Sequence, residues 1–249
     1  MSVKSVVKNA FSMPRTAPLY EAPPYIYRGD RSINILFKTT PETIRRLVPT
    51  PLVPNPDSLL FIYIGQFNVV EPQLFSYMEA GIGAPVSFSD TAGQYAICLY
   101  LDKTVAIVPG REIYGWPKKD AEISFTEQNE KVSAQVVREG VRLIDATVHR
   151  SERIDPMPEQ SAAPWFNLKL IPSVKKNAPP DVMQLTSTLM ESETKELYTG
   201  SATLKLGSSV SDPLEDIPIL EILEAKYVAD DFSLGYGDVI YDYLTESEH

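Results

Sequence analysis

The stretch Gly110-Arg111-Glu112-Ile113-Tyr114-Gly115-Trp116-Pro117-Lys118-Lys119 lies near the middle of the chain, between two apolar runs. Its glycines and its proline interrupt regular secondary structure, and aromatic residues stand close before a pair of lysines. On its own, the pair is most simply read as two solvated charges after a proline turn. The alternative is that Lys118 is a nucleophile kept out of water, and the rest of the chain decides between these interpretations.

The composition excludes several functional classes. The chain has 249 residues and a formal net charge of -10, so its electrostatic field repels nucleic acids and anionic membrane surfaces. No apolar run approaches the roughly 20 residues of a membrane span, and the N-terminus lacks the apolar core of a signal peptide. One cysteine and two histidines exclude a disulfide framework and a usual zinc site. We therefore expect a cytoplasmic protein that uses neither a metal nor a cofactor.

Short apolar runs typical of β-strands outnumber helical patterns. They lie at residues 33–37, 59–70, 85–88, 95–101, 105–108, 122–126, 132–137, 141–148, around 204, 219–228 and 238–244. Segments rich in proline, serine and charge predict long loops at 151–164 and 172–182. Residues 1–24 form a proline-rich arm, which lies over the surface or over a neighbouring subunit. The pattern predicts a single domain over residues 1–249, mostly β, built as a barrel or as two packed sheets.

The clearest helix pattern covers residues 40–49. Thr40 can cap the helix, and Pro41 suits its first position because the missing N–H has no intrahelical partner there. Apolar residues then recur at helical spacing until Pro49 ends the pattern.

The segment from Glu112 to Lys119 resembles the active-site segment of the acetoacetate decarboxylase family, in which the lysine after the proline forms a Schiff base with the substrate ketone. Further pieces match in order, at residues 85–88, 99–102, 168–172, 198–200 and 239–244. The resemblance covers roughly residues 18–245. It implies an α+β, mostly β fold with an antiparallel, cone-like β-barrel core and a few peripheral helices. It also implies a homo-oligomer.

A Schiff base forms only from a neutral amine, and a lysine with the ordinary pKa of about 10.4 is almost entirely protonated at pH 7. Lowering that pKa to about 6 requires roughly 6 kcal/mol of destabilisation of the ammonium. In an extended segment, the Lys118 and Lys119 side chains point to opposite faces. We therefore expect burial to lower the pKa of Lys118 more than repulsion from Lys119 does, which leaves Lys119 a secondary catalytic influence.

The resemblance also assigns other side chains to the site. The second glutamate of the decarboxylases matches Glu79, and the aromatic residue before it matches Tyr77. The first glutamate falls where this chain has no carboxylate, so that Tyr63 or its neighbour takes its place. Glu112 and Tyr114, inside the active-site segment, are candidate substrate contacts.

The arginine of the decarboxylases has no clean match. An ungapped alignment places Asp30 at its position and Arg31 one residue further, and Arg28 is the other candidate for holding the substrate carboxylate. A shift of one residue along a strand would turn Arg31 to the opposite face.

Three functions remain open on these residues. The first is decarboxylation of acetoacetate or a similar β-keto acid through a Schiff base at Lys118. The second is aldol, dehydration or cyclisation chemistry on another keto acid, using the same lysine. The third is binding of a small carbonyl metabolite without turnover.

Overall fold

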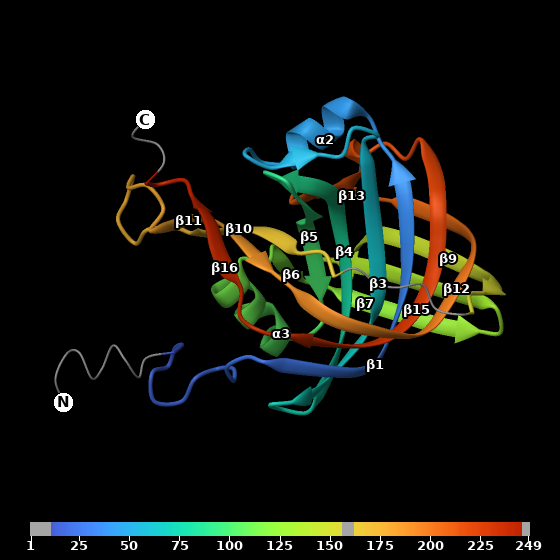
Figure 1. Ribbon diagram of the computed structural model, residues 1–249, viewed down its shortest axis with the longest axis horizontal. Coiled ribbons are helices and arrows are strands. Elements are labelled where there is room, and N and C mark those ends of the chain that lie inside the picture. The colour runs from blue at the N-terminus through green and yellow to red at the C-terminus, as the bar shows by residue number, and fades with distance from the viewer. Residues whose placement is uncertain (1–10, 156–161, 246–249) are drawn as a thin grey trace.

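A strongly curled β-sheet dominates the computed structural model, which describes residues 11–155 and 162–245 (Figure 1). The strands are β1 (Tyr25–Lys38), β2 (Val53–Pro54), β3 (Leu59–Glu71), β4 (Phe75–Phe88), β5 (Thr91–Leu101), β6 (Lys118–Asp120), β7 (Glu122–Gln128), β8 (Lys131–Arg138), β9 (Val141–Arg153), β10 (Trp165–Ile171), β11 (Val182–Thr188), β12 (Met190–Leu206), β13 (Ser208–Ser209), β14 (Asp212–Pro213), β15 (Glu221–Leu234) and β16 (Asp238–Asp242). The helical elements are α2 (Pro41–Leu47), α3 (Thr104–Pro109), the π-helical turn η1 (Gly110–Tyr114) and the 3-10 turn η2 (Leu214–Asp216).

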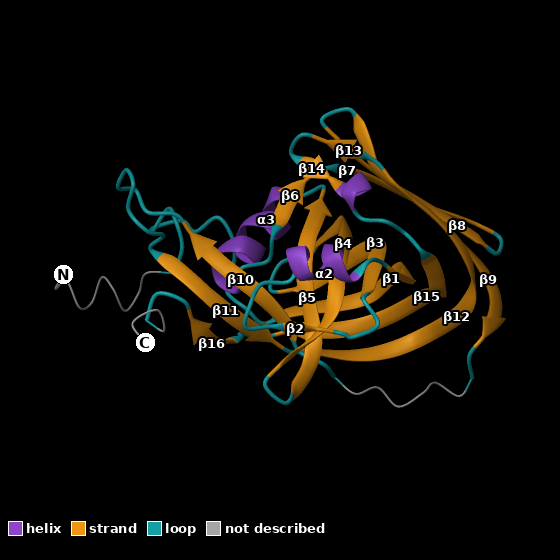
Figure 2. Cartoon of the chain, turned by 90° about the horizontal axis from the view of Figure 1, so that it is seen from above, coloured by secondary structure: helices purple, strands orange, loops and turns teal. Residues whose placement is uncertain are grey.

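The main sheet has 14 strands, and its hydrogen-bonded order is β16-β11-β10-β5-β4-β3-β1-β15-β12-β9-β8-β7, with β2 joined to β4 and β6 joined to β5. The pairs are antiparallel except where β5 meets β6 and β10. The sheet curls until β7 packs against β4 (Figure 2). The predicted antiparallel, mostly β architecture with few helices is confirmed, although the strand order does not close on itself within the residues described.

The sheet separates an apolar core from a cavity, as β1 illustrates. Ile33, Ile35 and Phe37 alternate along this strand and are fully buried in the larger apolar cluster. Ser32 and Asn34 point to the other face and line the cavity. The period of two that predicted this strand therefore also determines which of its residues reach the site.

The predicted helix is confirmed as α2. The Thr40 side chain accepts a hydrogen bond from the backbone N–H of Thr43, and Pro41 occupies the first turn. The buried Ile44 packs into the larger core, so the helix covers one end of the curled sheet (Figure 2).

Residues 105–108, predicted as a strand, lie instead in α3, and that prediction was wrong. The backbone N–H groups of Ala106 and Ile107 both bond to the carbonyl of Lys103, which begins a helical turn. A short run of valine, alanine and isoleucine has no periodicity that distinguishes a strand from a buried helix. The predicted loop at 151–164 was also wrong at its start, because β9 continues to Arg153. Residues 156–161 of that loop lie outside the described part.

The proline-rich arm is described from residue 11 onward, and residues 1–10 lie outside the described part. Its residues 11–24 form no helix or strand. Tyr20 is buried, and its hydroxyl donates a 2.6 Å hydrogen bond to Glu112 in η1. This part of the arm therefore lies over the surface of its own chain.

Within residues 11–155 and 162–245, no helix combines the length and the apolar character needed to cross a membrane.

Candidate active site

A cavity of about 790 Å³ lies between the sheet and the segment that runs from α3 to β6. Aromatic side chains form much of its wall, on both the sheet side and the α3 side. Lys118 lines this cavity, and the side chains around it form the candidate site.

Two glycines allow the segment before Lys118 to fold. A Cβ on Gly110 would lie 2.6 Å from Cδ of Lys118, so the glycine leaves room for the lysine stem. Gly115 has a φ of 79°, in the left-handed region, and a Cβ there would lie 2.5 Å from Cα of Lys169. Gly115 therefore requires glycine for its conformation and for close approach, whereas Gly110 leaves room for Lys118 in its present position.

Lys118 and Glu79 meet inside the cavity as a buried ion pair. The Lys118 Nζ atom lies 3.0 Å from Oε2 of Glu79, and the two side chains are only 10% and 7% exposed. The sheet order explains this contact, because β4 and β6 are both neighbours of β5: Glu79 pairs with Leu101 and Lys118 pairs with Leu99. We predicted apolar surroundings for Lys118 and assigned Glu79 to the same site, and the structure brings the two charged groups into direct contact.

Aromatic side chains enclose this ion pair. The Tyr63 hydroxyl donates a 2.5 Å hydrogen bond to Oε1 of Glu79, the carboxylate oxygen that does not face Lys118. Burial and the adjacent Glu79 charge raise the pKa of Tyr63 well above its usual range, so this phenol stays a donor. The Lys118 Nζ lies 5.8 Å from the ring centre of Tyr77 and 5.7 Å from that of Trp116, and it donates to the carbonyl of Ala106.

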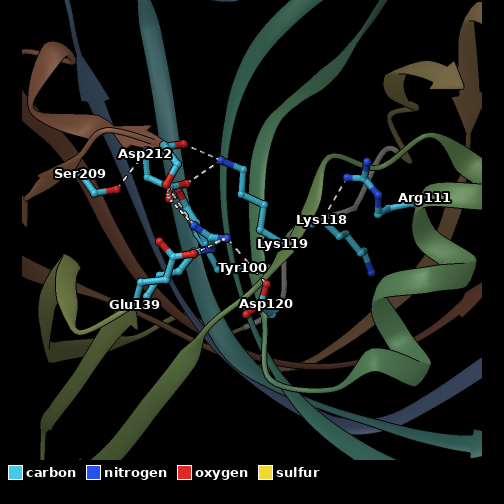
Figure 3. Close-up of polar contacts among 10 residues, drawn as sticks. Tyr100, Arg111, Lys118, Lys119, Asp120, Glu139, Ser209 and Asp212 are labelled. Carbon is cyan, nitrogen blue, oxygen red and sulfur yellow. Dashed lines mark hydrogen bonds and ion pairs between the residues drawn. The ribbon is translucent and has the colours of Figure 1, made fainter. Parts of the chain in front are cut away.

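Lys119 points away from this cavity, as Figure 3 shows. Its Nζ lies 2.7 Å from Oδ1 of Asp212 and donates to the carbonyl of Ser211. The two lysine side chains therefore occupy opposite faces of β6, as the sequence predicted for an extended pair. The paired Asp212 carboxylate balances the Lys119 charge. The predicted catalytic influence of Lys119 stays a prediction, and its orientation does not favour direct contact with a substrate in the cavity.

The two candidates in η1 behave differently. Tyr114 lines the cavity, but its hydroxyl is occupied by a 2.9 Å hydrogen bond to the carbonyl of Gly235. Glu112 is not among the cavity residues and accepts its hydrogen bond from Tyr20 of the arm. Tyr114 therefore forms part of the cavity wall, whereas Glu112 lies outside the cavity.

Neither candidate arginine reaches the cavity. Arg31 lies 3.1 Å from Glu127 of β7, and Arg28 lies 3.8 Å from Asp231; both guanidinium side chains are about half exposed. The register of β1 shifts between Tyr27 and Asp30, next to a glycine with positive φ, which turns Arg31 away from the cavity. Their role in holding a substrate carboxylate stays a prediction, which the position of both side chains outside the cavity does not favour.

Asp30, at the position of the family's arginine, is 1% exposed and lies across from Asp230 on β15. Burial is the main reason that the pKa of Asp30 rises to about 7, and the nearby Asp230 carboxylate adds to it. Asp230 itself lines the cavity, and burial together with Asp231 raises its pKa to about 6. One carboxylate of this pair, Asp230, therefore lies in the cavity wall, near the position where a cation was expected.

We expect Asp30→Asn to stabilise the protein at alkaline pH. The folded state keeps a proton on Asp30 up to about pH 7, whereas the unfolded chain releases it near the ordinary aspartate pKa of 3.8, so the free energy of unfolding falls as the pH rises between these values. The loss is on the order of 3 kcal/mol. The variant should therefore melt about 5–10 °C higher than the wild type at pH 8, with a smaller gain at pH 5. Thermal unfolding across this range, with the exposed Asp90→Asn as control, checks this; an equal shift at every pH would contradict it.

Several close contacts of Lys118 and Lys119 have no local signal in the sequence. Ala106 contributes a backbone carbonyl, which no side-chain pattern reveals, and Asp212 and Tyr100 come from distant segments. Trp116 stands in the same stretch, separated from Lys118 only by Pro117, and this proximity was the available signal. Among the residues described, no group of three or more histidine, cysteine or acidic side chains is arranged to hold a metal ion.

Comparisons with known proteins identify the family of this chain. The family model described as acetoacetate decarboxylase matches residues 12–244. The acetoacetate decarboxylase of Paraburkholderia phytofirmans is 32% identical over 252 residues, covering 100% of this chain and 98% of that protein. A solved acetoacetate decarboxylase structure is 28% identical, with a TM-score of 0.87 over 98% of this chain and 100% of the other. The enduracididine biosynthesis enzyme MppR, solved with pyruvate, is 16% identical and shares the fold, with a TM-score of 0.81 over 94% of this chain and 98% of its own. The chain belongs to the acetoacetate decarboxylase family.

Proposed function

We propose that this protein is a lyase that forms a Schiff base between Lys118 and a β-keto acid, acetoacetate or a close analogue, and releases carbon dioxide. The observation that carries the proposal is the buried Lys118 amine 3.0 Å from Glu79, at the wall of a cavity large enough for such a substrate. A lysine that reacts with a ketone must be able to lose its proton, and Glu79 Oε2 is placed to receive it.

The reaction then follows from these groups. The neutral Lys118 amine attacks the ketone carbon, and loss of water gives a protonated imine. The bond between the α-carbon and the carboxylate carbon breaks, its electron pair moves into the iminium, and carbon dioxide leaves. The resulting enamine takes a proton at carbon, for which Glu79 is the nearest acid, and water releases acetone and the free lysine. No external oxidant or reductant is consumed.

The surroundings of Lys118 favour loss of the carboxylate. The cations that line the cavity within the described residues are Lys118 and Lys226, and Lys226 lies 2.6 Å from Glu224 on β15. A substrate carboxylate beside Lys118 therefore faces the rings of Tyr77 and Trp116 without an arginine to stabilise it. Its charge disappears as neutral carbon dioxide forms, so an apolar wall favours the transition state over the bound substrate.

We expect Tyr63→Phe to lower kcat/KM by about 10- to 100-fold, because a buried hydrogen bond to a charged group contributes about 1.5–3 kcal/mol. Without the phenol, Oε1 of Glu79 has no donor and the carboxylate is free to turn from Lys118. Steady-state carbon dioxide release measures the effect. Tyr198→Phe, on β12 and not among the cavity residues, is the matched control. Unchanged kcat/KM in Tyr63→Phe would show that the Tyr63 hydroxyl does not contribute to catalysis.

Aldol or dehydration chemistry is the second candidate, because this chain has Tyr63 where the decarboxylases have a glutamate and lacks an arginine in the described part of the cavity. Purified protein is incubated with acetoacetate, and separately with pyruvate and an aldehyde. Carbon dioxide release above the spontaneous rate supports the proposal. Condensation product from pyruvate, with no release from acetoacetate, would instead assign the second chemistry. Absence of both products and of any adduct at Lys118 would leave a carbonyl-binding protein.

We further propose that the protein works as a cytoplasmic homo-oligomer, as the family resemblance implies. Size-exclusion chromatography with light scattering tests the oligomeric state, and a mass equal to one chain would contradict it.

A further inference from the structure

The cavity beside Lys118 is much larger than acetoacetate. Its volume is about 790 Å³, in the range that holds a drug-sized ligand, whereas acetoacetate fills only about 100 Å³. The aromatic residues of its wall are Tyr25, Tyr27, Phe61, Tyr63, Phe67, Phe75, Tyr77, Tyr114, Trp116, Trp165 and Phe232. The proposed chemistry uses the ketone, its α-carbon and the carboxylate. Most of this space is therefore available for the second substituent of the ketone.

A row of aromatic rings leads away from the reacting amine. The ring centre of Trp116 lies 5.7 Å from Lys118 Nζ and 5.2 Å from the ring centre of Trp165. Trp165 makes edge contacts with Phe61 and Tyr63, with ring centres 5.6 Å and 6.1 Å apart. Because Trp116 and Tyr63 already belong to the surroundings of the ion pair, Trp165 and Phe61 form the next layer of the wall beyond the reacting groups.

The neighbouring strand keeps two of these rings low over the sheet. β3 pairs with β4, which places Tyr63 opposite Gly81 and Phe61 opposite Gly83. A Cβ on Gly81 would lie 2.3 Å from Cε1 of Tyr63, and a Cβ on Gly83 would lie 2.4 Å from Cζ of Phe61. The two rings therefore lie across glycines, and a side chain at either position would push its ring towards the cavity. This pairing keeps the space above the rings open.

The wall of this space favours an aromatic group over an alkyl chain. Trp165 presents its ring at steep angles to its neighbours, 79° to Phe61 and 77° to Tyr63. A further ring placed among such rings gains edge-to-face or offset contacts in addition to the area that it buries, and an alkyl chain of equal length does not.

We propose that the natural substrate is a β-keto acid that carries an aryl or arylalkyl group on its ketone, with the ring held against Trp165 and Phe61. This inference rests on the proposed Schiff-base function and names its substrate class. With the ring on the Trp165 side, the carboxylate remains beside Tyr77. Carbon dioxide leaves as it does from acetoacetate, and the product is an arylalkyl or aryl methyl ketone.

Carbon dioxide release from three acids tests this class: acetoacetate, 3-oxo-5-phenylpentanoate and 3-oxononanoate, whose alkyl chain extends as far as the phenyl ring. We expect kcat/KM for the phenyl acid to exceed that for acetoacetate about 30- to 100-fold, because the buried ring adds binding energy in the transition state. It should exceed that for 3-oxononanoate at least about threefold. A phenyl acid no better than acetoacetate, or slower than the alkyl acid, overturns the proposal.

Two variants test which rings hold the group. Trp165→Leu should lower the ratio of kcat/KM for the phenyl acid to that for acetoacetate at least about tenfold, and Phe61→Leu at least about threefold, since each variant loses a ring but stays apolar. Phe88→Leu is the matched control, because Phe88 packs against the larger core and is not among the described residues that line the cavity. Each ratio compares two substrates on one protein, so a partly unfolded sample does not change it. Wild-type ratios in Trp165→Leu and Phe61→Leu overturn the assignment.

Binding of an alcohol separates this inference from the proposed function. 4-Phenylbutan-2-ol and butan-2-ol have no carbonyl group, so neither forms an imine with Lys118. Trp116 and Trp165 are the two tryptophans of the chain and both line the cavity, so tryptophan fluorescence reports binding there. We expect 4-phenylbutan-2-ol to bind at least about 30-fold more tightly than butan-2-ol, with the preference reduced in Trp165→Leu but not in Phe88→Leu.

The two proposals then fail in different ways. If no keto acid is decarboxylated but the alcohol preference holds, the proposed function fails and the aryl-binding site stands. Equal affinities for the two alcohols, or a preference that Trp165→Leu leaves unchanged, overturn the aryl-binding site even if carbon dioxide is released from acetoacetate.

Discussion

Replacing Lys118 with methionine is expected to lower carbon dioxide release from acetoacetate by about 10⁴-fold or more, to the spontaneous rate. Methionine retains most of the buried stem but has no amine, so no imine forms and the electron sink is lost. The size of the effect follows other enzymes from which the nucleophile of a covalent mechanism was removed. Gas release or an enzyme-coupled acetone assay, corrected for the rate without protein, measures it.

Lys118→Arg distinguishes the loss of the nucleophilic amine from the loss of the ion pair with Glu79. A guanidinium keeps the positive charge beside Glu79, but it stays protonated and forms no imine at working pH. We therefore expect this variant to remain folded, by circular dichroism and thermal melting, and to remain inactive. Substantial activity in either Lys118 variant would show that the reaction does not depend on an imine at this residue.

The second large effect is expected from Glu79→Gln, which should lower kcat about 10²- to 10⁴-fold, the usual contribution of a positioned acid–base group. Glutamine nearly preserves the size of the side chain and can still accept the Tyr63 hydrogen bond. It cannot accept the Lys118 proton or return one to the enamine. The pH–rate profile should lose one of its limbs, and the rate at which borohydride traps the imine should fall with kcat.

Glu127→Gln is the matched control for Glu79, because Glu127 is also a mostly buried carboxylate in ion pairs on the sheet, with Arg31 and Arg150. Its variant changes stability but should leave the pH–rate profile as in the wild type. An equal loss of kcat in the two glutamine variants would mean that Glu79 acts through stability alone.

The sequence predicted those elements of the fold that have a strong local signal. The period of two in β1 and the cap of α2 depend on neighbouring residues, and both are confirmed. The failure at α3 has the opposite cause, since a short apolar run takes its conformation from what packs against it. The strand order depends on pairing between segments far apart in the chain, and no local pattern specifies it.

The candidate site, like the fold, could be predicted only in part from the sequence. Lys118 and Glu79 were identified through motifs, and the structure brings them together because both of their strands flank β5. Arg31 lies outside the cavity because the bulge in β1 turns its side chain to the other face, and a bulge of this kind leaves little trace in the sequence. Asp212 could not be identified from the sequence, because the residues that donate hydrogen bonds to its carboxylate, Lys119, Tyr100 and Arg138, lie on separate strands.

Borohydride reduction in the presence of acetone, followed by peptide mass spectrometry, tests whether Lys118 forms the imine. It reads the covalent intermediate itself and does not depend on which keto acid is the natural substrate. We expect one isopropyl group on Lys118, its absence in Lys118→Met, and loss of carbon dioxide release in proportion to the modification. An unmodified Lys118 in protein that still releases carbon dioxide from acetoacetate, or an adduct on a different lysine, would contradict it.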